Sequence, residues 1–390
     1  MCPDRRNAGA GCLSHMSGNL WRRARVAAGD TYAGVMLRSA ASGESWARIV
    51  RTCASASDTD VSTLRRRVLD DIAQAVLFDW YVWLLTDPET SVGSAPLAEV
   101  PPPLLPELPR LIRLKYLTET NRWTTLASSA ASLSAVTGGD LSRSLVWREL
   151  LAQHGIVDVA SMVLTDRFGC WGFLDLWRTS APFTSDEVMF LARIRDAMTT
   201  ALRRCQAATF AVAPASGSRR PGPVVLLLSH GLDMLGQTPE THEYLRVLVP
   251  PPHGRVPIPA GAYNVAAQLL AVEAGVDSNP PSTRVHLSDG LWLTLRAARI
   301  GSPQPTGQQS IAVTIERASP AERMSLFGRA HGLSVREREV LHHLMTGSDT
   351  RDVARRMFLS EYTVQDHLKS IFTKTSVRTR RTLLARALGA

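Results

Sequence analysis

The last 58 residues of the chain alternate short apolar stripes with residues that start and stop helices, and this pattern constrains the fold most. Ser334 precedes Glu337 by three residues, which is the capping-box pattern of a helix start, and Gly347 ends the apolar stripe that follows. Asp349 restarts a helix, and Ser360 caps a third one after a two-residue turn. Helices this short need one another to bury their stripes, so we expect a small all-α bundle at residues 333–390.

The third of these helices has two chemically different sides. Its apolar residues follow helical spacing and should face the bundle: Val364, Leu368, Ile371 and Phe372. The opposite side is then polar: Tyr362, Gln365, Asp366, Lys369 and Thr373. A capped helix with a polar outer side, an apolar back and a tight turn before it meets the requirements for entering the major groove of DNA.

Each polar side chain on this outer side suits a base edge. Gln365 can bond to adenine, Lys369 to guanine, and Asp366 can accept a hydrogen bond from cytosine, with about 1–3 kcal/mol of discrimination for a good contact. Basic residues at and beyond the helix end are placed to meet phosphates, and a closing helix is expected at about 379–388. The predicted DNA-contacting residues are Tyr362, Thr363, Gln365, Asp366, Lys369, Lys374, Arg378 and Arg380.

The net positive charge of the chain agrees with a polyanionic partner. The chain carries a formal net charge of +9, and the segment from Leu333 onward has 11 Lys and Arg against 6 Asp and Glu. A short tail therefore holds more than half of the excess positive charge, which favours nucleic acid as a partner.

The same segment closely resembles the LuxR/GerE-type helix-turn-helix. The motifs that carry the resemblance are L-S-x-R-E-R-E-V-L, L-S-E-x-T-V-x-x-H-L and x-x-K-x-x-V-R-x-R, at fixed spacing. The resemblance implies that Gln365, Asp366 and Lys369 approach bases, and that the closing helix pairs two subunits. The family usually has Lys at the position of Gln365 and Gly at Ser376, so this chain departs from it at both.

The middle of the chain indicates a first α+β unit at 41–206, after a flexible leader at 1–40. Residues 78–90 read as a buried strand that enters a loop, and 157–180 as a strand pair turning at Asp166–Gly169. A helix should follow from Ser185 to Cys205, with Ser185 marking its start. The DRFGCWGFLDLWR hairpin and the F-T-x-x-E helix start resemble a GAF sensor domain over residues 60–206.

A second α+β unit is expected at 223–318, between linkers at 207–222 and 319–332. Its pattern gives a strand at 223–228, a helix opened by Thr238-Pro239-Glu240 and a helix at about 262–274. Strands then lie on both sides of a turn at Ser288-Asp289-Gly290, and a last strand follows. This order resembles a PAS-type sensor module. The predicted fold is thus multidomain α+β: a GAF-like and a PAS-like domain, followed by the four-helix helix-turn-helix domain.

Other features of the sequence argue against several classes of protein. The five cysteines form no CxxC pair and fit reduced thiols in a cytoplasm: Cys2, Cys12, Cys53, Cys170 and Cys205. We find no long apolar run for a membrane span, no catalytic motif and no metal or cofactor motif, so we expect no enzyme, cofactor, metal site or membrane contact. Cys170 could be a redox sensor, and the aromatic residues of the strands could line a ligand pocket. For both we favour simple packing in the core.

Two hypotheses for function follow. The first is a transcription regulator that binds double-stranded DNA as a homodimer, with RNA polymerase as a further candidate partner and an unknown small molecule or protein as effector. The second is a sensor and protein-interaction module whose C-terminal helices serve dimerisation without DNA. Duplex binding that weakens steeply as the salt concentration rises would support the first hypothesis over the second.

Overall fold

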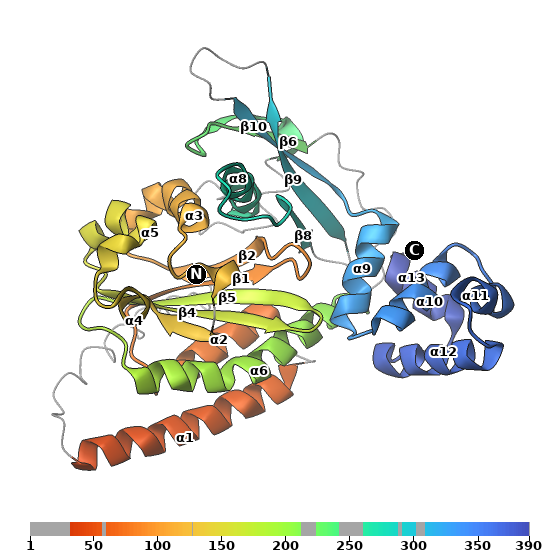
Figure 1. Cartoon of the computed structure of the whole chain (residues 1–390), viewed down its shortest axis with the longest axis horizontal. Helices are drawn as coiled ribbons and strands as arrows, with labels where there is room; N and C mark the ends of the chain where they lie inside the picture. Colours follow the sequence, from red (N-terminus) through yellow and green to blue (C-terminus); the bar gives the residue numbers. More distant parts are fainter. Residues whose placement is uncertain are drawn as a thin grey trace, which may run out of the picture.

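The computed structural model describes residues 32–56, 60–126, 128–211, 224–241, 260–287, 291–301 and 309–389, with side chains from residue 42 onward. Most of the predicted leader, most of the first predicted linker and the turn at Ser288-Asp289-Gly290 lie outside these residues. The described parts form two α+β units and a small helical lobe at the C-terminus, as Figure 1 shows. This arrangement confirms the predicted fold class.

The first unit is built on an antiparallel sheet in the order β2-β1-β5-β4-β3. Its strands are β1 (Trp80–Thr86), β2 (Gly93–Glu99), β3 (Ala130–Ser132), β4 (Asp158–Asp166) and β5 (Gly169–Arg178). The buried strand at 78–90 and the strand pair turning at Asp166–Gly169 are confirmed. Sequence analysis missed β2, an edge strand in which Pro96 is tolerated because one of its sides needs no ladder partner.

Helices cover both faces of this sheet. The long helices α1 (Tyr32–Ala54), α2 (Val61–Ile72) and α6 (Ser185–Ala208) bury one face, on which Trp83 and Trp171 lie. Trp177 lies three residues after Leu174, the strand partner of Trp83, so alternation puts Trp177 on the other face, beneath α3 (Leu108–Leu117) and α5 (Leu145–Glu149). Shorter elements complete this side: η3 (Pro102–Glu107), η4 (Trp123–Thr125), α4 (Leu133–Thr137), η5 (Leu141–Arg143) and η6 (Leu151–His154).

Two helix starts differ from the prediction. Helix α6 begins at Ser185, but Thr184 is its cap: the Thr184 hydroxyl accepts from the Glu187 N–H, and the Glu187 carboxylate accepts from the Thr184 N–H in return. The capping box pairs a residue with one three positions later, which is why Thr184 and not Ser185 takes the role. Helix α1 starts at Tyr32, inside the segment predicted as a leader.

The second unit repeats the strand order of the first. Its sheet runs β7-β6-β10-β9-β8, so in both units the first strand lies between the second and the last. The strands are β6 (Val224–Leu228), β7 (Met234–Gln237), β8 (Ser282–His286), β9 (Trp292–Ile300) and β10 (Ser310–Arg317). Residues 239–241 are helical at the predicted helix start, and the residues that follow lie outside the described part.

Helix α8 (Ala260–Glu273) joins the two units. Most of its side chains are buried because it packs on β9 of its own unit and on β2 and α3 of the first (Figure 1). Gly93 of β2 permits this approach, since a Cβ there would lie 2.8 Å from the amide nitrogen of Asn264.

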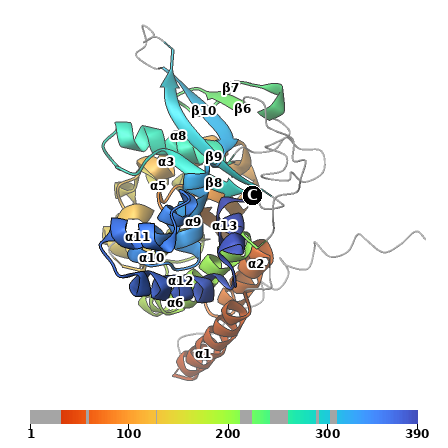
Figure 2. The ribbon, with the colours of Figure 1, turned by 90° about the vertical axis from the view of Figure 1, so that its right-hand side faces the viewer.

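The C-terminal lobe contains α9 (Pro320–Ala330), α10 (Val335–Met345), α11 (Thr350–Met357), α12 (Glu361–Thr375) and α13 (Arg380–Leu388). Helix α9 occupies the second predicted linker and lies between the two α+β units and the other four helices (Figure 1). Figure 2 views these helices with the lobe toward the reader. Its start carries a signal that sequence analysis passed over: Ser319 and Glu322 form a capping box, with Pro320 at the first helical position. None of the described helices is long and apolar enough to cross a membrane.

Candidate DNA interface

The predicted caps fix the starts of three helices of the C-terminal lobe: α10, α11 and α12. The hydroxyl of Ser334 accepts from the Glu337 N–H at 3.2 Å, and the Glu337 carboxylate accepts from the Ser334 N–H at 2.6 Å. Asp349 caps α11 at 2.8 Å, and Ser360 caps α12 by accepting from the Thr363 N–H at 3.0 Å. These bonds supply partners for N–H groups that the first helical turn leaves unpaired.

The turn between α11 and α12 is tight. Phe358 has φ 55°, in the left-handed region, and the Leu359 N–H returns to the Ala354 carbonyl at 2.9 Å. This conformation ends α11 and sends the chain directly into the Ser360 cap. The two helices therefore form the predicted corner, and the Phe358 side chain is 95% exposed.

Helix α12 presents the two predicted sides. Val364, Leu368 and Ile371 are buried in the lobe, while Phe372 is half-buried. The outer residues Gln365, Asp366, Lys369 and Thr373 are exposed, and Tyr362 is 74% exposed. The outer side of α12 is thus free of the sensor-like units and open to a partner.

Within this outer surface the side chains contact one another. The Lys369 ammonium lies 3.3 Å from a carboxylate oxygen of Asp366 and 5.9 Å from the centre of the Tyr362 ring. Thr363 is different, because its hydroxyl pairs with that of Ser360 at 2.9 Å and so belongs to the helix cap. The structure therefore brings Tyr362, Asp366 and Lys369 together and turns Thr363 toward the turn.

Lys374 forms an ion pair within the same chain. Its ammonium donates to both carboxylate oxygens of Glu337, at 2.8 and 2.7 Å, and Ser370 donates to the same carboxylate at 2.6 Å. Burial of Glu337 opposes its charge, but these bonds prevail and lower the pKa of the carboxyl to about 2. Lys374 therefore fixes α12 against the start of α10, a role that its position in the sequence did not reveal.

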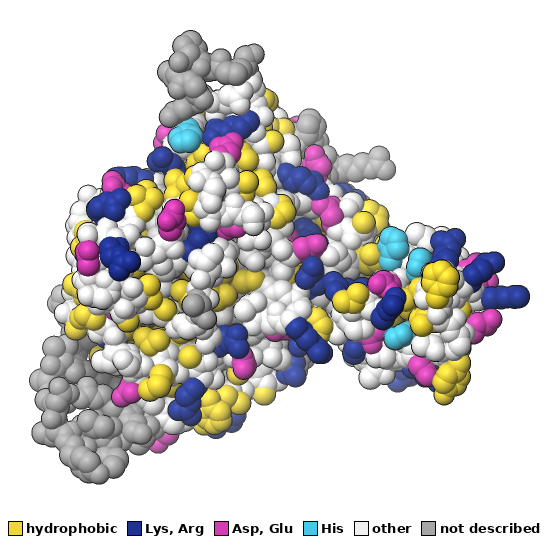
Figure 3. Space-filling view, in the orientation of Figure 1, with side chains coloured by type: hydrophobic (Ala, Val, Ile, Leu, Met, Phe, Trp, Pro, Cys, Tyr) yellow, Lys and Arg dark blue, Asp and Glu magenta, His cyan; other side chains and the backbone are white. Residues whose placement is uncertain are grey.

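The basic residues beyond α12 divide in a similar way. Arg378 is exposed, whereas Arg380 is half-buried and donates to the Ser348 carbonyl. Arg351 and Arg355 of α11 are also exposed, and sequence analysis did not single them out. On the face of the C-terminal lobe that Figure 3 shows, Lys and Arg side chains lie at several places, which agrees with the positive charge of the segment.

Cys170, weighed above as a redox sensor, is buried on β5. Burial raises the pKa of its thiol to about 11, so the reactive thiolate is disfavoured at neutral pH. This environment supports simple packing. Among the described residues, no group of three or more His, Cys, Asp or Glu side chains is arranged to hold a metal ion.

Two short helices joined by a tight corner, with the second exposing a polar side, define a helix-turn-helix domain. Residues 331–387 match the family described as bacterial regulatory proteins of the luxR family. Helices α10–α13 of the C-terminal lobe therefore form a LuxR-type helix-turn-helix domain, as the sequence motifs predicted.

Two curated relatives match a short stretch of the chain. Over 48 residues the chain is 42% identical to the probable csgAB operon transcriptional regulatory protein of Salmonella typhimurium and to the CsgBAC operon transcriptional regulatory protein of Escherichia coli. The match covers 12% of this chain and 22% of each relative, so the chain spans about a fifth of the length of these curated relatives.

Solved structures give a weaker likeness. The chain is 13% identical to Escherichia coli SdiA, covering 86% of this chain and 93% of that one with a TM-score of 0.30. It is 17% identical to Vibrio cholerae VqmA, covering 43% and 82% with a TM-score of 0.17. Scores this low do not establish a shared fold over the two α+β units.

Proposed function

We propose that this chain is a DNA-binding transcriptional regulator of the LuxR type, which inserts α12 into the major groove. The observation that carries the proposal is the division of α12 into a buried side, with Val364, Leu368 and Ile371, and an exposed polar side. Recognition of bases requires this combination, because the helix must be held firmly while its outer side chains stay available.

Within this proposal, Gln365, Asp366 and Lys369 contact bases and Arg378 contacts phosphate. Lys369 must exchange its 3.3 Å contact with Asp366 for a guanine edge, and release of Asp366 lets that carboxylate accept from cytosine. Lys374 and Arg380 remain candidates for phosphate contact. Lys374 would use the N–H donor that is not bonded to Glu337, and Arg380 the donors that are not bonded to the Ser348 carbonyl.

Duplex binding measured against salt concentration tests the proposal. Arg378→Ala should lower affinity for all sequences and reduce the salt slope by about one unit, while Gln365→Ala should change which operators are preferred. Arg299→Ala, on the second unit far along the chain from α12, is the matched control and should leave the slope unchanged. Salt-independent binding, or unchanged preference after Gln365→Ala, would overturn the assignment.

A homodimer on DNA is the proposed active state. Leu384 and Leu388 of α13 lie four residues apart and are half-buried, so they are available to a second copy of the same helix. RNA polymerase is a further proposed partner. Because the matched family consists of regulators, we propose no enzymatic role, and the chain would act in the cytoplasm where its target DNA lies.

We propose that the two α+β units, GAF-like at 41–206 and PAS-like at 223–318, sense an effector. Helix α9 supports a coupling role, since it packs against α6 of the first unit and α13 of the DNA-binding domain. A signal changes DNA binding only if it favours one arrangement of these units over another.

The alternative, a protein-interaction module, is favoured by one observation. Phe358 and Tyr362 together expose a large aromatic surface at the corner of the helix-turn-helix. If this surface binds a protein instead of DNA, the unchanged chain should not bind a DNA duplex, and Phe358→Ser should abolish binding of the protein partner. The salt titration described above therefore decides between the two.

A further inference from the structure

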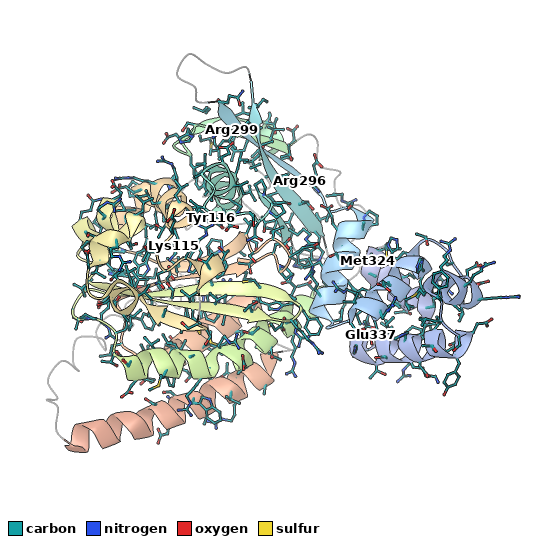
Figure 4. All side chains as sticks on the ribbon, in the orientation of Figure 1. Lys115, Tyr116, Arg296, Arg299, Met324 and Glu337 are labelled. Atoms are coloured by element: carbon teal, nitrogen blue, oxygen red, sulfur yellow. The ribbon has the colours of Figure 1, made fainter. Side chains whose placement is uncertain are left out.

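A cavity of about 580 Å³ lies in the first unit, between the sheet face that carries Trp177 and the helices above it. This volume is typical of small-molecule sites. Most of its wall is apolar, contributed by strands β1, β2 and β5 and by α3, on which Lys115 and Tyr116 lie (Figure 4). One part comes from elsewhere: Ala260 and Asn264 of α8, in the second unit, also line it.

Four residues of the wall carry buried polar atoms that have no hydrogen-bond partner within the described part of the chain. They are Asn121 (Oδ1), Ser144 (Oγ), Trp177 (Nε1) and Asn264 (both amide atoms). Each of these residues is more than nine-tenths buried. A buried polar group without a partner costs about 1–3 kcal/mol, so unpaired atoms gathered around one cavity indicate a ligand that would pair them.

The two buried charged groups of the cavity neutralise each other. Lys115 and Asp175 form an ion pair at 2.8 Å, and both are largely buried. Asp175 also accepts from Trp123 Nε1 at 2.8 Å and from the Ser161 hydroxyl at 2.6 Å. The other two charged residues of the wall, Arg66 and Glu99, have opposite signs and are exposed and half-buried, respectively, so the buried part of the cavity offers an ionised ligand no free counterion.

We propose that this cavity binds an uncharged, largely apolar molecule that carries both a hydrogen-bond donor and an acceptor, such as an alkyl-aromatic carboxamide. The Trp177 N–H and the Asn264 amide nitrogen donate to its acceptor, and Asn121 Oδ1 accepts from its donor. The apolar wall, which includes Trp123 and Trp177, contacts its body.

The ligand also joins the two units. Asn264 belongs to α8, which reaches the cavity by packing closely on Gly93 of β2. A molecule that bonds to Asn264 and to Trp177 at the same time favours the arrangement in which α8 is docked on the first sheet. The site therefore deepens the proposed sensory role, while its affinity is measurable without DNA and independently of α12.

Calorimetric titration of the full chain with three matched probes tests the proposal: 4-butylbenzamide, N,N-dimethyl-4-butylbenzamide and 4-butylbenzoate. The benzamide should bind with one site per chain, the dimethyl amide several-fold more weakly because it lacks a donor, and the benzoate at least tenfold more weakly because of its charge. Asn264→Leu and Trp177→Phe should each weaken benzamide binding by about five- to tenfold, the worth of one buried hydrogen bond.

Trp46→Phe is the control for Trp177→Phe, since Trp46 lies on α1, is 38% exposed and is remote from the cavity wall. Thermal unfolding of each variant verifies that it folds. Hydrogen exchange tests the bridging: benzamide should slow exchange in α8 as well as in α3. Absence of saturable benzamide binding, equal binding of the benzoate, or wild-type affinity in both variants would overturn the site, and protection confined to the first unit would overturn the bridging.

Discussion

Arg284 of β8 donates two hydrogen bonds of 2.6 Å to Asp87, one to each carboxylate oxygen, across the boundary between the two α+β units. Both residues are buried. The same guanidinium donates to the Glu322 carbonyl at the start of α9, at 2.9 Å, and to the Glu89 carboxylate at 3.0 Å. One side chain therefore connects the first unit, the second unit and the helix that leads to the DNA-binding domain.

Replacing Arg284 should loosen this junction strongly. Arg284→Met leaves the Asp87 carboxylate buried without its counterion, which typically costs about 3–5 kcal/mol of folding free energy. Denaturant unfolding measures the loss. Arg299→Met is the control, because the Arg299–Glu273 pair is more exposed and should contribute about 1 kcal/mol or less. Equal losses in the two variants would contradict the role given to Arg284.

The Glu337–Lys374 pair predicts an acid-sensitive DNA-binding domain. The pKa of Glu337 is about 2 in the folded chain against 4.5 for the free group, so its stabilising effect is complete above pH 4.5 and is lost as pH falls toward 2. Glu337→Gln should remove this part of the acid dependence and lower stability at pH 7. We would measure unfolding of α10–α13 by hydrogen exchange, with Glu339→Gln as the exposed control. An unchanged acid profile in Glu337→Gln would contradict the prediction.

His331 predicts a second, separate pH window. It lies at the end of α9, with its ring centre 4.3 Å from that of Phe327. Burial, together with the charges of Arg386 and Arg203, outweighs a hydrogen bond to the Lys374 backbone and lowers the pKa of His331 from 6.5 to about 4. The folded state favours the neutral ring, so stability is complete above pH 6.5 and declines as pH falls toward 4. His331→Gln should abolish this decline in thermal scans between pH 7 and 4. A decline of the same size in the variant would assign it to other groups.

The helix-turn-helix could be predicted in detail because its signals are local. A cap and its N–H partner are three residues apart, as at Ser334 and Glu337, and the buried side of α12 follows from spacing within one helix. The exposed positions of Gln365 and Lys369 follow from the same spacing. Which bases these residues contact stays a prediction.

Other features depend on partners distant in the chain. The sequence predicts a phosphate contact for Lys374, but it does not indicate that Lys374 also binds Glu337, 37 positions away. The pairing of Arg284 with Asp87 and the entry of Asn264 into the first unit's cavity span even longer separations. Such contacts are set by how whole units pack, and no periodicity or cap in the sequence reports them.

Ser376 offers a test of how backbone strain is distributed in this domain. It ends α12 with φ 52° and ψ 41°, in the left-handed region that costs a residue with a side chain about 1 kcal/mol and glycine much less. The LuxR-type motif usually has glycine at this position, and the geometry supplies the physical reason. Ser376→Gly should therefore raise the free energy of unfolding by about 0.5–1 kcal/mol. Ser376→Ala is the control, because it removes the hydroxyl but keeps the Cβ and should give no such gain. If both variants were equally stabilised, the hydroxyl and not the backbone would be responsible.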